Sequence, residues 1–111
     1  MLDVNAYGRI ASDIKIKQSK NKKHLYTNFL LASHQNGQTT FIRCVCFDAM
    51  ASLLNSYFTK GDRIILKGDL VNDDYDNTKF AFKLKVNNFE FVETKEDHIK
   101  NKEKYIKKKN G

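Results

Sequence analysis

Hydrophobic and polar residues alternate along most of the first 92 positions, and such alternation predicts β-strands. In 39–47, for example, the odd-numbered side chains fall on one face and the even-numbered ones on the other. The expected strands are 2–10, with a short continuation at 14–17, then 25–33, 39–47, 63–71 and 79–92.

After residue 47 the apolar residues change to a spacing of three and four, which predicts one helix of about eleven residues. Asp48 is expected to cap its start and Gly61 to stop it. Its apolar positions are Met50, Leu53, Leu54, Tyr57 and Phe58.

Two local signals predict the shape of the strands. Asn36-Gly37, between the second and third strands, is the residue pair of a tight hairpin turn. In the last strand the apolar parity changes at Asn87-Asn88, so that Phe89 and Phe91 take over, which predicts a β-bulge.

The order of three strands, one helix and two strands predicts an all-β OB-fold, a five-stranded, partly open barrel. In this fold the binding surface is the face of strands 2 and 3 together with loops 1–2 and 4–5, here 18–24 and 72–78. The domain is expected to span 1–92. Residues 93–111 have few large apolar side chains, so we expect a basic tail that is flexible or weakly helical.

Composition narrows the class of protein. A chain of 111 residues suits one domain, and its 20 Lys and Arg against 13 Asp and Glu leave a net charge of +7. No apolar run is long enough for a membrane helix, and no signal peptide is visible. We therefore expect no membrane association and a cytoplasmic location.

The sequence contains no arrangement that points to catalysis. His24, His34 and His98 are scattered, and no nucleotide-loop, metalloprotease or nucleophile-elbow motif is present. Cys44 and Cys46 lack the further ligands of a zinc site, so we interpret them as small apolar side chains in the sheet. We expect a protein that is not an enzyme and has no metal or cofactor.

Binding chemistry is better represented. Lysines are concentrated in 15–23, where they would neutralise the phosphates of a nucleic acid. The alternative is a solvated loop that only keeps the protein soluble. The basic residues expected to follow a nucleic-acid backbone are Lys15, Lys17, Lys20, Lys22, Lys23, Arg43, Lys67, Lys79, Lys83 and Lys85.

Aromatic side chains on an exposed face would stack on the bases of a single strand. Phe41 and Phe47 share the face of the third strand that is expected to point outward, with Arg43 and Val45, and Tyr75 lies in a polar loop. For each phenylalanine the alternative is a place in the core, and Phe29, Phe80 and Phe82 are candidates for filling the barrel.

Residues 2–92 resemble the single-stranded DNA-binding protein family of bacteria, plasmids and phages. The stretches that carry the resemblance are VNAYGRI at 4–10 with Asp13, NFLLA at 28–32, TFIRCVCF at 40–47, LLNSYFTKGD at 53–62 and ILKGDL at 65–70.

The resemblance implies that Phe41, Phe47 and Tyr75 stack on bases, that Arg43 is basic on the same surface, and that the chain forms a homo-oligomer, a dimer or tetramer. Its subunit-pairing strand would carry Leu2, Val4 and Ala6. The family's acidic tip is replaced here by a lysine-rich end, so we expect no partner docking through such a tip and favour a phage or mobile-element version.

The leading hypothesis is sequence-independent binding of single-stranded DNA, which coats and protects the strand during replication or recombination. A protein–protein adaptor of a replication complex would use the same aromatic row as its interface. An RNA-binding OB module is the third hypothesis.

Overall fold

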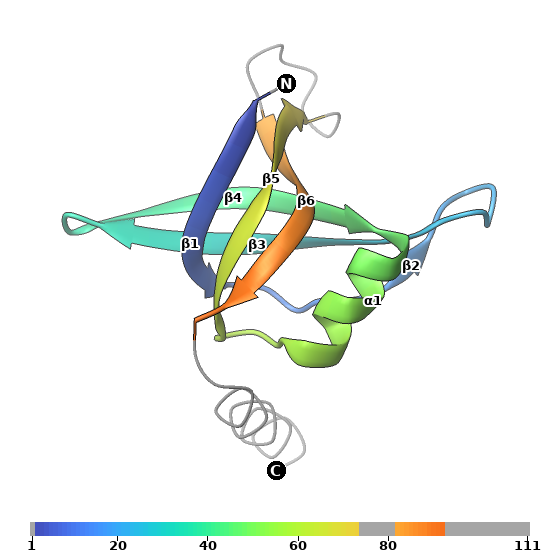
Figure 1. The fold of residues 1–111 in the computed structure, drawn as a ribbon, viewed down its shortest axis with the longest axis horizontal. Helices are drawn as coiled ribbons and strands as arrows, with labels where there is room; N and C mark the ends of the chain where they lie inside the picture. The colour runs from blue at the N-terminus through green and yellow to red at the C-terminus, as the bar shows by residue number, and fades with distance from the viewer. Residues whose placement is uncertain (1, 74–81, 93–111) are drawn as a thin grey trace.

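A long hairpin ribbon, formed by strands β3 (Leu25–Gln35) and β4 (Gln38–Phe47), underlies the fold of this computed structural model (Figure 1). The structure describes residues 2–73 and 82–92. At the tip of the ribbon Asn36 and Gly37 both adopt positive φ, of 53° and 76°, as a tight two-residue hairpin turn requires. The turn predicted from this residue pair is therefore confirmed, and it sets a pairing register that runs from Gln35–Gln38 to Tyr26–Phe47.

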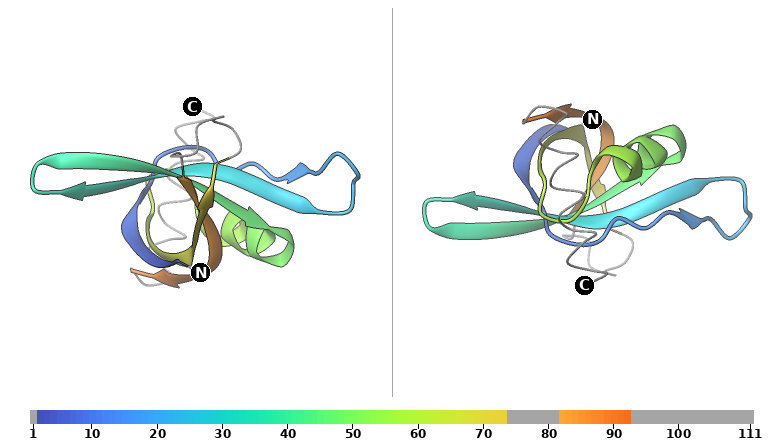
Figure 2. Two further views of the ribbon diagram at one scale, coloured as in Figure 1. Left: turned by 90° about the horizontal axis from the view of Figure 1, so that it is seen from above. Right: turned by 90° about the horizontal axis from the view of Figure 1, so that it is seen from below.

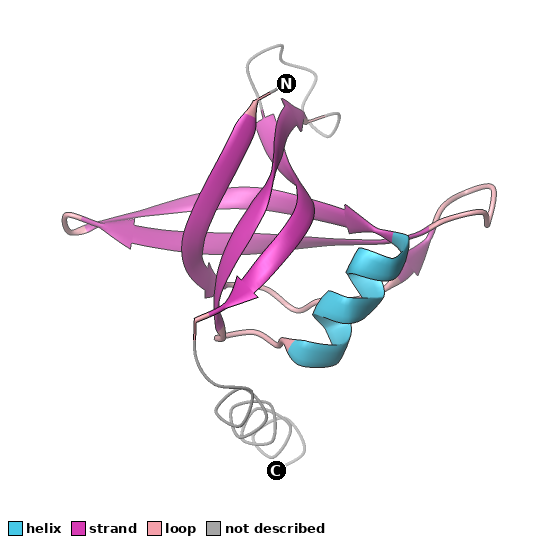
Figure 3. Ribbon diagram, viewed as in Figure 1, coloured by secondary structure: helices cyan, strands magenta, loops and turns pink. Residues whose placement is uncertain are grey.

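The remaining strands close a barrel over one side of this ribbon. Strands β1 (Asp3–Ile10), β5 (Arg63–Asn72) and β6 (Phe82–Phe91) follow β4 and β3 around it in the order β1-β5-β6-β4-β3. The circle closes where Arg9 and Ile10 pair with Ala32 and Leu31. All pairings are antiparallel except that of β4 with β6. With one helix between β4 and β5, this is the predicted OB-fold (Figure 3).

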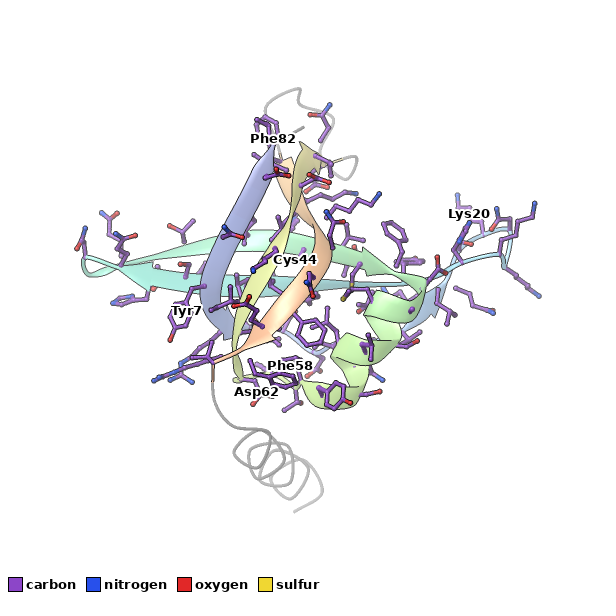
Figure 4. All side chains as sticks on the ribbon, viewed as in Figure 1. Tyr7, Lys20, Cys44, Phe58, Asp62 and Phe82 are labelled. Carbon is purple, nitrogen blue, oxygen red and sulfur yellow. The ribbon has the colours of Figure 1, made fainter. Side chains whose placement is uncertain are left out.

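The core fills the space between the ribbon and the crossing strands. Helix α1 (Asp48–Tyr57) lies across one end of the barrel and buries Ala51 and Leu54 there, followed by Phe58 (Figure 4). Other buried apolar residues come from all five barrel strands: Ile10, Phe29, Leu31, Cys44, Cys46, Ile64, Leu66, Leu84 and Val86.

The predicted bulge in the last strand is present. Lys67 pairs with Asn88 and the next residue, Gly68, pairs with Val86, so Asn87 is the extra residue of β6. The extra residue reverses the parity of the strand. Phe89 and Phe91 therefore turn toward the core, where their rings lie 5.2 and 5.0 Å from that of Phe58.

Three local expectations were wrong in detail. The N-cap of α1 is Phe47 rather than Asp48, and no side chain bonds to the free amides at that end. The helix ends at Tyr57, so Gly61 does not stop it but, with φ of 98°, belongs to the turn into β5. The strand expected at 14–17 is reduced to β2 (Lys17–Gln18), while Ile14 and Ile16 pack against the core.

The observed strands otherwise follow the expected ones, although the ribbon extends closer to its turn than predicted. Some predicted residues lie outside the described part of the chain. They are the binding-site candidates Tyr75 and Lys79, the barrel candidate Phe80, and the tail expected at 93–111.

The close approach of β5 and β6 at the bulge generates a prediction for Gly68. A Cβ atom there would overlap the carbonyl oxygen of Lys85. We expect Gly68→Ala to lower the free energy of unfolding by about 2–3 kcal/mol, in the range of overpacked cores, measured by urea denaturation. The matched variant Gly37→Ala, at a position with open space and positive φ, should cost only about 1–2 kcal/mol. Equal losses would contradict a rigid contact at the bulge.

Candidate nucleic-acid interface

One face of the β3–β4 ribbon is turned away from the barrel. Strands β1, β5 and β6 and helix α1 all lie on the opposite side of the ribbon (Figure 2). Among the described elements, none covers the outer face. The hairpin register decides which side chains stand on this face, because residues paired across antiparallel strands point the same way.

Phe41 and Phe47 stand on this outer face, as predicted. Phe41 is 61% exposed and pairs with Ala32, whereas Phe47 is 41% exposed and pairs with Tyr26. Val45 lies on the same outward face, as expected from its parity, but it is only 4% exposed there. Its neighbours in the sheet are Asn28 of β3 and Lys85 of β6, and the main core cluster does not include it.

One basic candidate, Lys85 of β6, lies beside an aromatic ring of the outer face. The ammonium group of Lys85 is 5.8 Å from the centroid of the Phe47 ring, a cation–π distance. Lys83 lies two residues before Lys85 in β6, so both point to the same face of a strand that runs parallel to β4. Lys85 and Phe47 come together because β6 is the direct neighbour of β4 in the barrel, although the two residues are far apart in the sequence.

Two basic candidates already hold an acidic partner. The Arg43 guanidinium donates to the buried Asp73 carboxylate over 3.0 Å, while about half of the Arg43 side chain stays exposed. The Lys67 ammonium is 2.6 Å from a Glu90 carboxylate oxygen. Lys67 is on β5, which β6 separates from β4, so the structure does not bring it beside Phe47.

The lysine-rich loop is an ordered turn held by its own polar side chains. The Ser19 and Asn21 side chains hydrogen-bond to each other over 2.6 Å. The Lys23 amide donates to Asn21 Oδ1, the His24 amide to Ser19 Oγ, and the Lys22 amide to the Ser19 carbonyl. The loop lies at the end of the ribbon opposite the Asn36-Gly37 turn (Figure 4). Lys15, Lys20, Lys22 and Lys23 are all exposed around this end.

Asp48 joins this loop to the end of β4. Its Oδ1 accepts a hydrogen bond from the Leu25 amide, and its Oδ2 lies 3.1 Å from His24 Nδ1. Asp48 itself adopts a positive φ of 51°, a conformation that Asp tolerates better than most residues. The residue expected to cap the helix therefore fastens the loop instead.

The structure distinguishes the remaining aromatic candidates. Phe29 is buried in the barrel, as expected, whereas Phe82 is 47% exposed near the end of the barrel that carries the N-terminus. Tyr26 was missed as a site residue, although it shares the outer face with Phe47. The signal was present in the sequence, because a two-residue turn at Asn36-Gly37 places residue 26 opposite residue 47.

Among the described residues, both thiols are buried and both histidines, His24 and His34, are exposed. Cys44 and Cys46 are buried and unbridged, and burial raises the pKa of each thiol to about 12. Within 2–73 and 82–92, no three His, Cys, Asp or Glu side chains are grouped as metal ligands. The described helix is also too short and polar to cross a bilayer.

The residues expected to pair subunits differ in exposure. Leu2 is exposed, but Val4 and Ala6 are partly buried and pack against the core. Strand β1 pairs with β5 from Asp3 to Arg9, and along its other edge it meets β3 only at Arg9 and Ile10. Within the described part of the chain, most of that second edge therefore has no partner strand.

The sequence was compared with protein families and with known proteins, and both comparisons found matches. The sequence model of the single-strand binding protein family matches residues 1–92. A curated relative, the single-stranded DNA-binding protein of Fusobacterium nucleatum, is 34% identical over 79 residues. The match covers 63% of this chain and 51% of the relative, so the chain matches about half the length of that protein.

Solved structures share the fold at low sequence identity. The mitochondrial single-stranded DNA binding protein from S. cerevisiae superposes with a TM-score of 0.69 at 21% identity, covering 84% of this chain and 95% of that one. The single-stranded DNA binding protein from Thermus aquaticus gives 0.69 at 19% identity, covering 85% of this chain and 41% of that one. The SSB domain of a Synechococcus protein gives 0.67 at 12% identity, over 80% and 93% of the two chains.

Proposed function

The chain belongs to the single-strand binding protein family, and from this premise we propose that it binds single-stranded DNA without regard to sequence. In this role it coats and protects the strand during replication or recombination, without catalysing a reaction. The curated relative from Fusobacterium nucleatum is named a single-stranded DNA-binding protein. A phage or mobile-element origin stays a prediction.

The observation that carries this proposal is the outer face of the β3–β4 ribbon. Phe41 and Phe47 expose aromatic rings on a sheet surface that no other described element covers. Exposed rings are costly in water, and unpaired bases are the ligand whose flat faces cover them. The lysine loop and Lys85 supply positive charge beside the rings, which is what a phosphate backbone requires.

The family resemblance implies Tyr75 and Arg43 as further residues of this interface, and Lys67, Lys79 and Lys83 are proposed because they are basic. Tyr75, which follows β5 in the sequence, stacks on a further base. Arg43 reaches phosphate while its pair with Asp73 fixes its direction. Lys67, Lys79 and Lys83 follow the backbone where the strand leaves the ribbon.

We also propose that the protein assembles as a homo-oligomer through β1. The backbone of β1 between Asp3 and Gly8 pairs on one side with β5, and its opposite edge would accept the same strand of a second copy. Since Val4 and Ala6 face the core, backbone hydrogen bonds and the exposed Leu2 would carry this contact.

Removal of single aromatic rings tests the stacking role. We expect Phe41→Ala, Phe47→Ala and Tyr75→Ala each to weaken binding of a labelled oligo-dT by about 1–3 kcal/mol, the contribution of one stacked base. The matched control Leu53→Ala removes a side chain that is similarly exposed, at 43%, on α1 and should leave affinity unchanged. Circular dichroism checks the fold. Unchanged affinity in all three folded variants would contradict base stacking.

Loss of charge from the lysine loop tests phosphate binding. We expect the triple variant Lys20→Gln, Lys22→Gln and Lys23→Gln to reduce the salt slope of binding by about 2, since each single-strand phosphate contact contributes about 0.7. Lys60→Gln, in the turn after α1, should leave the slope unchanged. An unaltered salt slope in the triple variant would mean that these lysines do not contact phosphates and only keep the protein soluble. Duplex DNA and oligo-U of equal length, used as competitors, distinguish single-strand DNA binding from nonspecific attraction and from RNA binding.

Sedimentation measures the assembly directly. We expect the full chain to have two or four times its monomer mass of 12.9 kDa. Leu2→Asp should shift the equilibrium toward monomer, because it places a charge on the proposed contact, whereas Leu53→Asp on α1 should not. A monomer at all concentrations would contradict pairing through β1.

A further inference from the structure

Four side chains form a row across the sheet at the end of the ribbon that carries the lysine loop. Lys17 of β2 pairs with Tyr26 of β3, and Tyr26 pairs with Phe47 of β4. Paired residues of antiparallel strands point to the same face, so these three stand on the outer face together. Lys85 of β6 completes the row with its ammonium group 5.8 Å from the Phe47 ring.

The two rings at the centre of the row lie side by side rather than in a parallel stack. Their centroids are 6.5 Å apart and their planes are inclined by 42°. Phe47 is well exposed, and Tyr26 is partly exposed. Each ring therefore keeps part of its surface available to a ligand on the outer face.

Negative charge near the row is already engaged by the protein. Asp48 follows Phe47 directly, and both of its carboxylate oxygens have partners, the Leu25 amide and the His24 ring. The cations Lys17 and Lys85 stand at the two ends of the row, so an anionic strand that crosses it meets positive charge on either side of the rings.

We propose that Tyr26 is a base-stacking residue beside Phe47, and that Lys17 and Lys85 hold phosphates on either side of the pair. A single strand bound here crosses the ribbon from β2 toward β6, with adjacent bases on the two rings. This inference rests on the proposed binding of single-stranded DNA. The competing role for Tyr26 is purely structural, because cross-strand aromatic pairs also stabilise sheets.

A tryptophan reporter separates the two roles, since the chain contains no tryptophan. Tyr26→Trp introduces a single indole at the proposed site, and we expect its fluorescence to be quenched as oligo-dT is added and to recover at high salt. The matched control Tyr57→Trp puts the indole on α1, at a residue with 41% exposure, where oligo-dT should not quench it.

Affinity provides a second, independent readout. Tyr26→Ala should weaken oligo-dT binding about 5- to 150-fold, the range of one stacked base, while Tyr26→Phe keeps the ring and the affinity. Lys17→Gln should lower the salt slope by about 0.7, and Lys60→Gln should not. Urea denaturation of each variant reports any purely structural effect.

The outcomes distinguish this inference from the function on which it rests. If the unmodified chain binds oligo-dT, and the Tyr26→Trp variant binds it equally well without a change in fluorescence, Tyr26 is not a stacking residue and the proposed function stands. The same conclusion follows if Tyr26→Ala lowers stability but leaves affinity unchanged. If the unmodified chain does not bind oligo-dT at all, the proposed function fails, and the inference fails with it.

Discussion

The register between β3 and β4 determines which side chains of the ribbon enter the core and which face outward. A one-residue slip would move every side chain of β4 to the opposite face. Cys44 and Cys46 would then leave the core, and Phe41 and Phe47 would enter it. The positive φ of both Asn36 and Gly37 sets this register. A turn whose residues are not proposed to bind DNA thus decides which aromatic rings stand on the outer face.

Aromatic residues serve two opposed purposes in this chain, and local geometry separates them. The bulge at Asn87 turns Phe89 and Phe91 inward, where they pack with Phe58 against the core. On β4, which has no comparable register shift against β3, Phe41 and Phe47 stay outside. Burial of the first group stabilises the barrel, whereas exposure of the second leaves apolar surface for a binding partner.

The positive charge of the interface is held in place by polar contacts. Ser19 and Asn21 order the loop that carries the lysines, and Asp48 fastens this loop to the end of β4. A loop ordered before binding loses less conformational entropy when it meets a phosphate backbone. The buried Asp73 directs Arg43 in the same way. Acidic residues therefore support a surface whose proposed ligand is an anion.

Much of this arrangement follows from the sequence, because strand alternation, the Asn36-Gly37 turn and the change of parity at Asn87 are local signals. They were sufficient to predict the OB-fold, the outward Phe41 and Phe47, and the bulge. The pairing of Tyr26 with Phe47 was also determined by the position of the turn, although it was not recognised as part of a site.

The contacts between residues that are distant in the sequence depend on how the barrel closes. Lys85 reaches Phe47 because β6 lies parallel to β4, Asp48 bonds the loop before β3 instead of capping its helix, and Val45 is buried on an outward face. The sequence suggested that Lys67 follows a nucleic-acid backbone, but in the barrel its ammonium group lies 2.6 Å from a Glu90 carboxylate oxygen. Alternation along one strand reports only which face a residue occupies. The neighbours on that face depend on barrel closure, which brings together strands that are remote in the sequence.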